Sequence, residues 1–415
     1  MDATASSEED VQSTASPPRW RRVVAALGVL DWVAVGLFAL GLIFLVTGVL
    51  PWSSAGTTMT RIAPILLFLF AVIVLAELTA QAQFFDVVAA RIAIIGRGSY
   101  AALFGLTFAF ATITTIFLNL DTTAVLLTPV MLATAARARI APMPMAMTTV
   151  WLANTASLLL PVSNLTNLLA ANRVGLPVLS FAERMALPQV AALIATAACL
   201  WLFYWRPGLR PSGGYVPPAP VVPRHRRLFQ AAALACGLFV IGVLAGVTLP
   251  VVSISCAGIL VVAFAFGARD QLHWRLIPWR LLIFLSGLFL VVETVSEHGL
   301  ATVLRTLIGT DAGAEGVWRA AGTSAALSNL INNLPAYLAG EAVIGPDHRD
   351  QLLGLLLGSN IGPLILPWAS LATLLWHERC RAAGVPVNWR RFALTGLVTT
   401  VVVLAAATGA LLLTS

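Results

Sequence analysis

Two stretches of sequence decide the fold: Asn154-Thr-Ala-Ser-Leu-Leu-Leu-Pro161-Val-Ser-Asn164-Leu-Thr-Asn167-Leu-Leu169 and its near-repeat Asn360-Ile-Gly-Pro-Leu-Ile-Leu-Pro367-Trp-Ala-Ser370-Leu-Ala-Thr373-Leu-Leu375. Each copy has a proline and a cluster of Asn, Ser and Thr inside an apolar stretch. In lipid an unpaired backbone group is costly, so such a break survives only where protein buries it or where it lines a wet cavity. Two breaks at matching places in two halves are typical of a secondary transporter whose substrate site lies near the bilayer midplane.

The composition is that of a polytopic membrane protein. Hydrophobic residues make up 59% of the 415 residues and charged residues only 10%, against roughly 25% charged in soluble domains. The net charge of +7 is spread over the ends of apolar segments, so it indicates membrane orientation and not a nucleic-acid partner. Several stretches have the length of roughly 20 residues that crosses a bilayer: 32–50, 62–76, 187–205, 228–249 and 391–413.

The polar residues outside these stretches suggest neither a metal site nor an enzyme. The four cysteines and five histidines have no metal-site spacing, so we expect no metal and no cofactor. No nucleophile elbow, zinc-protease motif or carboxylate pair lies within a span, which argues against an intramembrane enzyme. Residues 1–18, rich in Ser, Thr, Asp and Glu, are expected to form a disordered tail without a signal peptide.

The arginines at the segment ends orient the chain, because cytoplasmic loops carry the excess of basic residues. Arg19, Arg21 and Arg22 predict a cytoplasmic N-terminus in the inner (cytoplasmic) membrane. The Pro-rich stretch 206–227 holds five arginines and no acidic residue and is expected to be a cytoplasmic linker. It would separate a first transmembrane repeat, 19–205, from a second, 228–415.

The same counts predict an all-α fold of two inverted-topology repeats, each with a re-entrant hairpin and a discontinuous helix. Stretch 99–136 is basic at both ends and should enter and leave from the cytoplasm, whereas 318–343 should form a hairpin from outside. Stretches 144–171 and 351–376 should cross as broken helices. One extra leading span inverts the second half. The amphipathic stretches 85–95 and 299–308 should lie along the membrane surfaces.

The chemistry is expected where the hairpin tips meet the breaks. An interrupted helix exposes N–H groups with partial positive charge and carbonyls with partial negative charge, and Asn, Ser and Thr add donors and acceptors. Such a site suits a small oxyanion, a neutral hydroxylated solute or a cation. The candidate substrate- or ion-binding residues are Asn119, Asp121, Thr122, Ser163, Asn164, Asn167, Asn332, Asn333, Asn360, Ser370 and Thr373.

Asp121 is the only acidic residue expected deep in the bundle, where a charge is costly unless it is paired or hydrated. It would bind and release a proton or coordinate sodium; the alternative is a carboxylate that caps the hairpin tip. Glu77 and Glu293 hold matching places near the membrane surfaces, where carboxylates are often structural. For the asparagines, structural bonding at a break competes with substrate contact, and their recurrence in both halves favours contact.

These residues resemble a known family. The run Gly358-Ser-Asn360-Ile-Gly-Pro-Leu-Ile-Leu-Pro367-Trp-Ala-Ser370-Leu-Ala-Thr373-Leu-Leu-Trp376 is similar to the signature of the arsenite and antimonite efflux permeases of the ArsB type. Stretch 119–129, with its Leu-Thr-Pro ending, and Asn332-Asn333-x-Pro335 resemble that family's hairpin tips. The family belongs to the ion transporter superfamily, with sodium–dicarboxylate symporters and NhaD-type sodium/proton antiporters.

The resemblance implies proton-motive efflux of arsenite or antimonite by an elevator-like motion, in a homodimer that is sometimes aided by a soluble ATPase. It covers nearly the whole chain from Trp32. Two positions depart from the family pattern: the first tip reads Asn119-Leu120-Asp121 where adjacent polar residues are frequent, and Trp368 stands where a smaller residue is usual. No cysteine lies in the tips or breaks, so thiolate ligation of arsenic is not indicated.

Three functions on this fold remain in competition. The first is proton-coupled efflux of arsenite or antimonite, a neutral oxyacid or small inorganic anion. The second is sodium-coupled uptake of a dicarboxylate or another oxyanion, and the third is sodium/proton exchange with Asp121 as the shared carrier. The coupling ion is therefore H⁺ or Na⁺. A passive channel is a weaker alternative, because inverted broken helices favour alternating access.

Overall fold

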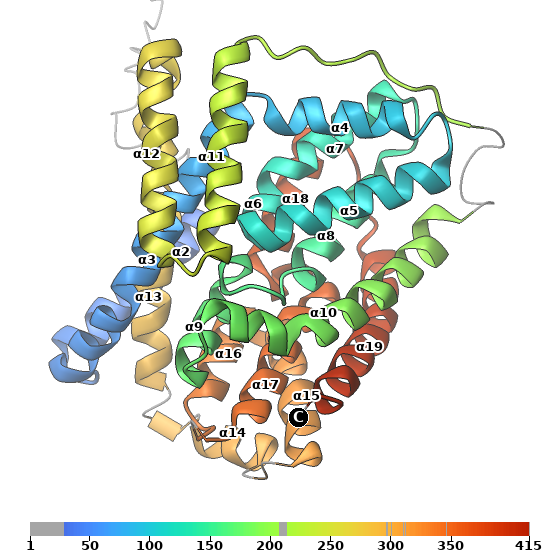
Figure 1. Cartoon of the computed structure of the whole chain (residues 1–415). Coiled ribbons are helices and arrows are strands. Elements are labelled where there is room, and N and C mark those ends of the chain that lie inside the picture. The colour runs from blue at the N-terminus through green and yellow to red at the C-terminus, as the bar shows by residue number, and fades with distance from the viewer. Residues whose placement is uncertain are drawn as a thin grey trace, which may run out of the picture.

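Helices dominate the part of the chain that the computed structural model describes, namely residues 29–206, 214–295, 298–299, 301–309, 311, 313–345 and 347–414. Among these residues there is no strand, and the helices form one bundle (Figure 1). The tail expected at 1–18, the arginines at 19, 21 and 22, and residues 207–213 of the expected linker lie outside the described residues.

The first half of the bundle runs from two long helices through a hairpin and a broken helix to a final long helix. Its elements are α2 (Val29–Val46), α3 (Trp52–Gln81), α4 (Phe84–Ile95), α5 (Tyr100–Leu118), α6 (Leu120–Thr122), the π-helical turn η1 (Thr123–Leu127), α7 (Thr128–Arg137), α8 (Pro142–Thr155), the 3-10 turn η2 (Pro161–Ser163), α9 (Leu165–Val174), α10 (Val178–Leu200) and its π-helical extension η3 (Trp201–Trp205).

The second half repeats this order after one additional helix, α11. Its elements are α11 (Arg226–Leu244), α12 (Leu249–Gly267), η4 (Arg269–Gln271), η5 (Trp274–Leu276), α13 (Trp279–Val295), α14 (Ala301–Ile308), α15 (Ala314–Ile331), α16 (Asn333–Glu341), α17 (Arg349–Ile361), η7 (Gly362–Leu364), η8 (Pro367–Ala369), α18 (Leu371–Ala382) and α19 (Trp389–Leu412).

The two halves pack reciprocally, as inverted repeats do. Helix α2 packs on α13 while α3 packs on α12, and the final helices of the halves, α10 and α19, pack on each other. The short helices α4 and α14 lie toward opposite ends of the bundle (Figure 1). The inverted-repeat fold predicted from the sequence is therefore confirmed.

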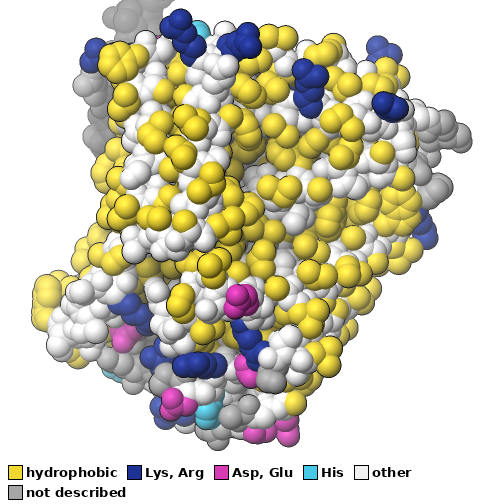
Figure 2. Space-filling model, viewed as in Figure 1, with side chains coloured by type: hydrophobic (Ala, Val, Ile, Leu, Met, Phe, Trp, Pro, Cys, Tyr) yellow, Lys and Arg dark blue, Asp and Glu magenta, His cyan; other side chains and the backbone are white. Residues whose placement is uncertain are grey.

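Six helices of the described chain are long and apolar enough to cross a membrane, judged by length and composition. On the face drawn in Figure 2, hydrophobic side chains form a broad band between two charged ends. Arginines stand at the end that residues 214–225 cross, whereas the opposite end carries both signs of charge (Figures 1 and 2). The six helices are Trp52–Gln81, Tyr100–Leu118, Val178–Trp205, Arg226–Leu244, Leu249–Gly267 and Trp389–Leu412.

Asparagine forms the tip of each re-entrant hairpin. Asn119 (φ 88°) and Asn332 (φ 91°) have nearly the same positive-φ backbone, which asparagine tolerates better than most residues. Each side-chain oxygen caps the following helix: Asn119 Oδ1 accepts from the Asp121 N–H at 2.8 Å, and Asn332 Oδ1 accepts from the Leu334 N–H at 3.4 Å. The two tips are thus equivalent because each contains the same type of asparagine-capped turn.

The two broken helices are interrupted at Pro161 and Pro367, as predicted from the sequence. Pro161 and Pro367 each begin a single 3-10 turn after an extended leucine, because the residue before proline avoids helical geometry. Asn164 then caps α9 by accepting from the Thr166 N–H at 3.3 Å, and Ser370 caps α18 by accepting from the Ala372 N–H at 3.2 Å. The first break is buried within the bundle, whereas in the second Ala369 is buried and Trp368 is 51% exposed.

Close packing of α19 against the second break predicts a stability effect. A Cβ at Gly396 would lie 1.9 Å from the carbonyl oxygen of Leu364, whereas a Cβ at Gly409 of the same helix would meet nothing within 4 Å. We expect Gly396→Ala to destabilise the protein by about 1–3 kcal/mol through overpacking. Thermal unfolding in detergent should show a lower melting temperature for Gly396→Ala than for the wild type. The matched Gly409→Ala should unfold at the wild-type temperature. Equal melting temperatures would contradict this packing.

Candidate functional site

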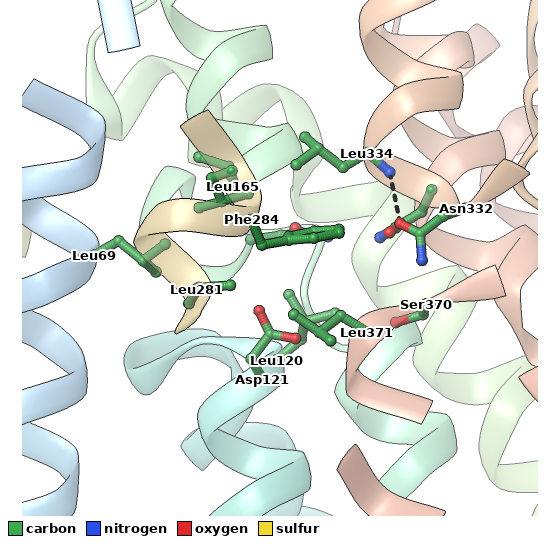
Figure 3. Close-up of a pocket in the computed structure, with 13 residues that line it drawn as sticks. Leu69, Leu120, Asp121, Leu165, Leu281, Phe284, Asn332, Leu334, Ser370 and Leu371 are labelled. Carbon is green, nitrogen blue, oxygen red and sulfur yellow. Dashed lines mark hydrogen bonds between the residues drawn. The ribbon is translucent and has the colours of Figure 1, made fainter. Parts of the chain in front are cut away.

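Both hairpin tips and the second segments of both broken helices meet at one cavity that also faces α3 and α13 (Figure 3). Its free interior volume is about 30 Å³, enough for one or two water molecules. The cavity lies between the hairpin and broken-helix elements on one side and two long helices on the other. It is lined by Leu69, Leu120, Asp121, Asn164, Leu165, Leu281, Phe284, Leu285, Asn332, Asn333, Leu334, Ser370 and Leu371.

Five of the eleven predicted site residues line this cavity. They are Asp121, Asn164, Asn332, Asn333 and Ser370, and they come from both tips and both breaks. No basic side chain and no cysteine is among the lining residues. The described walls therefore offer amides, one hydroxyl and one carboxylate within a largely apolar surface.

Asp121 directs its carboxylate into the cavity, toward Leu281 and Phe284 (Figure 3). Among the described residues this carboxylate accepts no hydrogen bond and forms no ion pair. The cap that the alternative interpretation assigned to it is made instead by Asn119, which receives the Asp121 backbone N–H. An unpaired carboxylate among apolar side chains gains most from binding a proton or a cation.

Asn360 is the centre of a buried network that joins the two broken helices. Its Oδ1 accepts from Asn164 Nδ2 at 2.9 Å and from Thr166 Oγ1 at 2.7 Å, and its Nδ2 donates to Asn167 Oδ1 at 2.7 Å. Asn360, Thr166 and Asn167 are fully buried. The oxygen and the nitrogen of the Asn360 amide both form hydrogen bonds within the protein. In this structure Asn360 therefore stabilises the packing of the two broken helices against each other.

The remaining predicted site residues are also buried but do not line the cavity. Asn167 Nδ2 donates to the carbonyls of Ser157 (2.6 Å) and Leu160 (3.0 Å), which the first break leaves without helical partners. Ser163 Oγ donates to the Ile116 carbonyl at 2.7 Å and thereby ties the break to α5. The others away from the cavity are Asn119, Thr122, Asn360 and Thr373.

Sequence reasoning missed two residues that stabilise the breaks. Gln189 of α10 donates to the Thr155 carbonyl and accepts from the Leu158 N–H, both at 2.9 Å. Asn329 of α15 donates to the Gly362 carbonyl at 2.9 Å and accepts from the Leu366 N–H at 3.2 Å. A signal was available for both, because a lone amide side chain within an apolar membrane helix needs a partner.

The expectation that Asp121 is the only acidic residue deep in the bundle is wrong. Glu341 is 3% exposed, and its Oε1 accepts from Arg61 Nη2 at 2.6 Å. Glu341 is the last residue of α16, the second helix of the hairpin predicted over 318–343. Trp368, which stands where the family usually has a smaller residue, does not line the cavity. Its indole N–H donates to the Asn329 carbonyl at 2.8 Å.

One solved structure similar to this chain is described as a transporter, and several similar curated proteins are described as arsenical pump membrane proteins. A crystal structure described as that of the Alcanivorax borkumensis YdaH transporter, with an unusual topology, matches with a TM-score of 0.54 at 13% identity, covering 92% of this chain and 97% of that one. This likeness concerns the fold alone.

Among curated proteins, an arsenical pump membrane protein of Escherichia coli is 31% identical over 358 residues, which are 80% of this chain and 82% of the relative. A putative arsenical pump membrane protein of Bacillus subtilis is 24% identical over 395 residues, 86% of this chain and 89% of the relative. The model of the citrate transporter family (CitMHS) matches residues 23–373. The chain, a multi-pass membrane protein and secondary transporter, therefore belongs to the citrate transporter family, as a relative of the arsenical pump membrane proteins whose signature its second broken helix resembles.

Proposed function

We propose that this transporter exports arsenite and antimonite from the cytoplasm, driven by the proton motive force. The observation that carries the proposal is the lining of the central cavity, in which amides, a hydroxyl and one unpaired carboxylate converge without a basic side chain. Near neutral pH arsenite is a neutral triol. Its recognition requires hydrogen-bond donors and acceptors, which Asn and Ser provide, and requires no cation.

The absence of cysteine from the described cavity lining also bears on the mode of recognition. Thiolates bind trivalent arsenic strongly, which suits a sensor or a store better than a permease that must release its substrate. Hydrogen bonds in a wet cavity are individually weak, each contributing about 1 kcal/mol net. A site of this kind releases its cargo readily after it opens to the other side.

Asp121 is proposed to couple transport to protons. The carboxylate would carry a proton inward while arsenite moves outward, because only its neutral form is compatible with a closed cavity walled by Leu69, Leu281 and Phe284. The small free volume of about 30 Å³ suggests a narrowed state of the site. Substrate entry would then require the tips and breaks to move against α3 and α13.

We propose that the protein lies in the cytoplasmic membrane and that the Arg-rich end of the bundle faces the cytoplasm. Basic residues at this end include Arg97, Arg139, Arg224 and Arg381, which stand in or beside the short loops of one side. Cytoplasmic loops carry such an excess. The N-terminus would lie on the same side, since α2 and α11 must both begin there.

Uptake of a citrate-like carboxylate is the second candidate, favoured by the description of the matching family. A carboxylate substrate carries negative charge into the site and needs cationic or multiple N–H partners. The cavity already holds the Asp121 carboxylate and, within its described lining, no Arg, Lys or His. Repulsion between two buried anions argues against this candidate unless sodium ions intervene.

Transport of arsenite is the first expected outcome. Cells that lack their own arsenite pump should accumulate less arsenite when they express this protein, and everted membrane vesicles should take up arsenite when respiration acidifies their interior. The same vesicles assayed with citrate, succinate and sodium should show no sodium-dependent flux. Equal arsenite accumulation with and without the protein would refute the proposed substrate, and sodium-driven carboxylate uptake would establish the second candidate.

Replacement of the cavity carboxylate tests the coupling. We expect Asp121→Asn to reduce proton-driven arsenite flux to the level of vesicles without the protein, because the amide carries no titratable proton. The matched control is Glu378→Gln, which neutralises an exposed carboxylate of α18 outside the cavity and should leave flux unchanged. Wild-type flux in an Asp121→Asn protein that elutes as a folded species would contradict a coupling role.

A further inference from the structure

A second polar chamber lies beside the far end of hairpin α15–α16, away from the central cavity. It is lined by charged residues of three helices, Arg61 of α3, Arg173 of α9 and Glu293 of α13, together with Glu341 of α16. Its free interior volume is about 220 Å³, which holds several water molecules. We name this chamber the outer vestibule, because α16 packs against α14, which lies at the end of the bundle opposite α4 (Figure 1).

Helix α16 lines both the central cavity and the outer vestibule, as α3, α9 and α13 also do. Asn333 and Leu334, at the start of α16, line the central cavity, whereas Leu338 and Glu341, at its end, line the outer vestibule. The distance along the helix axis from Asn333 to Glu341 is about 12 Å. Helix α16 is therefore one of four helices that run from one chamber to the other.

The polar side chains of α16 lie on one face. Asn333, Tyr337 and Glu341 are spaced by four residues, so they stand above one another on the helix surface. Tyr337 is fully buried, and its hydroxyl has no hydrogen-bond partner within the described chain. Buried tyrosine hydroxyls usually find a partner, so a water molecule is the partner that we expect for this hydroxyl.

Glu341 and Tyr337 share two charged neighbours, Arg61 and Arg173. Glu341 forms an ion pair with Arg61 and interacts electrostatically with Arg173 and Glu293. Tyr337 interacts with Glu341, Arg61 and Arg173. The titratable and charged groups that face this part of α16 thus come from α3, α9 and α13.

We propose that Glu341 and Tyr337 form a proton path that connects the outer vestibule with Asp121 in the central cavity. The proposal rests on the proposed function, because it supplies the route by which the coupling proton enters. Water in the outer vestibule delivers a proton to the Glu341 carboxylate, which then leaves its pairing with Arg61. Through a bridging water, the Tyr337 hydroxyl accepts that proton on its oxygen and releases its own to water held by Asn333.

The Asp121 carboxylate takes up the proton from that water. Each step breaks one O–H bond and forms another, and one proton moves inward overall. The Asn333 amide does not itself carry the proton; it positions the water between Tyr337 and Asp121. The competing role for these residues is structural: the Arg61–Glu341 ion pair would simply hold hairpin α15–α16 against α3.

Two transport modes in proteoliposomes separate the proton path from the structural role. Arsenite flux driven by an imposed pH gradient needs net proton movement, whereas exchange of labelled for unlabelled arsenite at equal pH does not. We expect Tyr337→Phe and Glu341→Gln to lower gradient-driven flux by about tenfold or more while exchange stays at the wild-type rate. Glu341→Gln keeps an oxygen that can accept from Arg61, so the ion pair's geometry is retained as a hydrogen bond.

Two controls alter the same chemistry elsewhere. Tyr204→Phe removes a hydroxyl that bonds Thr395, and Asp350→Asn weakens the ion pair with Arg184. Neither residue lines the central cavity or the outer vestibule, and both variants should show wild-type flux in both modes.

The outcomes separate the proton path from the proposed function. A wild type without gradient-driven arsenite flux overturns the proposed function and the proton path with it. If the wild type shows gradient-driven arsenite flux and the Tyr337→Phe and Glu341→Gln variants show the same flux, the proton path alone is overturned. Parallel loss of driven flux and exchange in both variants shows the structural role and also overturns it.

Discussion

The structure depends on satisfying the backbone groups that two interrupted helices expose in the middle of the bundle. Lipid offers these groups no partner, so side chains from neighbouring helices must supply them. Gln189 and Asn167 serve the first break, and Asn329 serves the second. Asn360 then links the broken helices through three side-chain hydrogen bonds. Only with the breaks held in this way can two hairpin tips meet them and enclose a polar cavity.

The two repeats share a backbone plan but differ in chemistry. Asn154 holds the place in the first half that Asn360 holds in the second, yet Asn154 Oδ1 has no partner within the described chain, and neither has Thr373 Oγ1. The only carboxylate in the cavity lining comes from the first tip, whereas the polar face of α16 belongs to the second. Of the two hairpins, only the second lines the outer vestibule. The proposed proton therefore approaches Asp121 from the side of the second hairpin.

Local signals were readable from the sequence, and long-range partners were not. Proline at 161 and 367 and asparagine at 119 and 332 act on their own backbone, so the breaks and the tips were predicted at the observed residues. Five candidate residues line the cavity for the same reason. The binding roles of all eleven candidates stay predictions.

What the sequence could not give depends on which helices become neighbours. Asn360 reaches residues almost 200 positions away. Glu341 is buried because α16 packs against α13 and α17, where Arg61 of α3 reaches its carboxylate. Periodicity describes one helix at a time, and it contains no information about which amide in α10 or α15 will face a break. Inverted repeats therefore predict the plan of the bundle more reliably than its buried polar contacts.

The central claim is that substrate binds where the two tips and the two breaks converge. Crystals grown with arsenite and measured at the arsenic absorption edge would test it most directly. The account predicts one anomalous peak within hydrogen-bonding distance of Asn332, Ser370 or Asp121, in a cavity wider than the present one. An anomalous peak at a cysteine, or only in the outer vestibule, would contradict it.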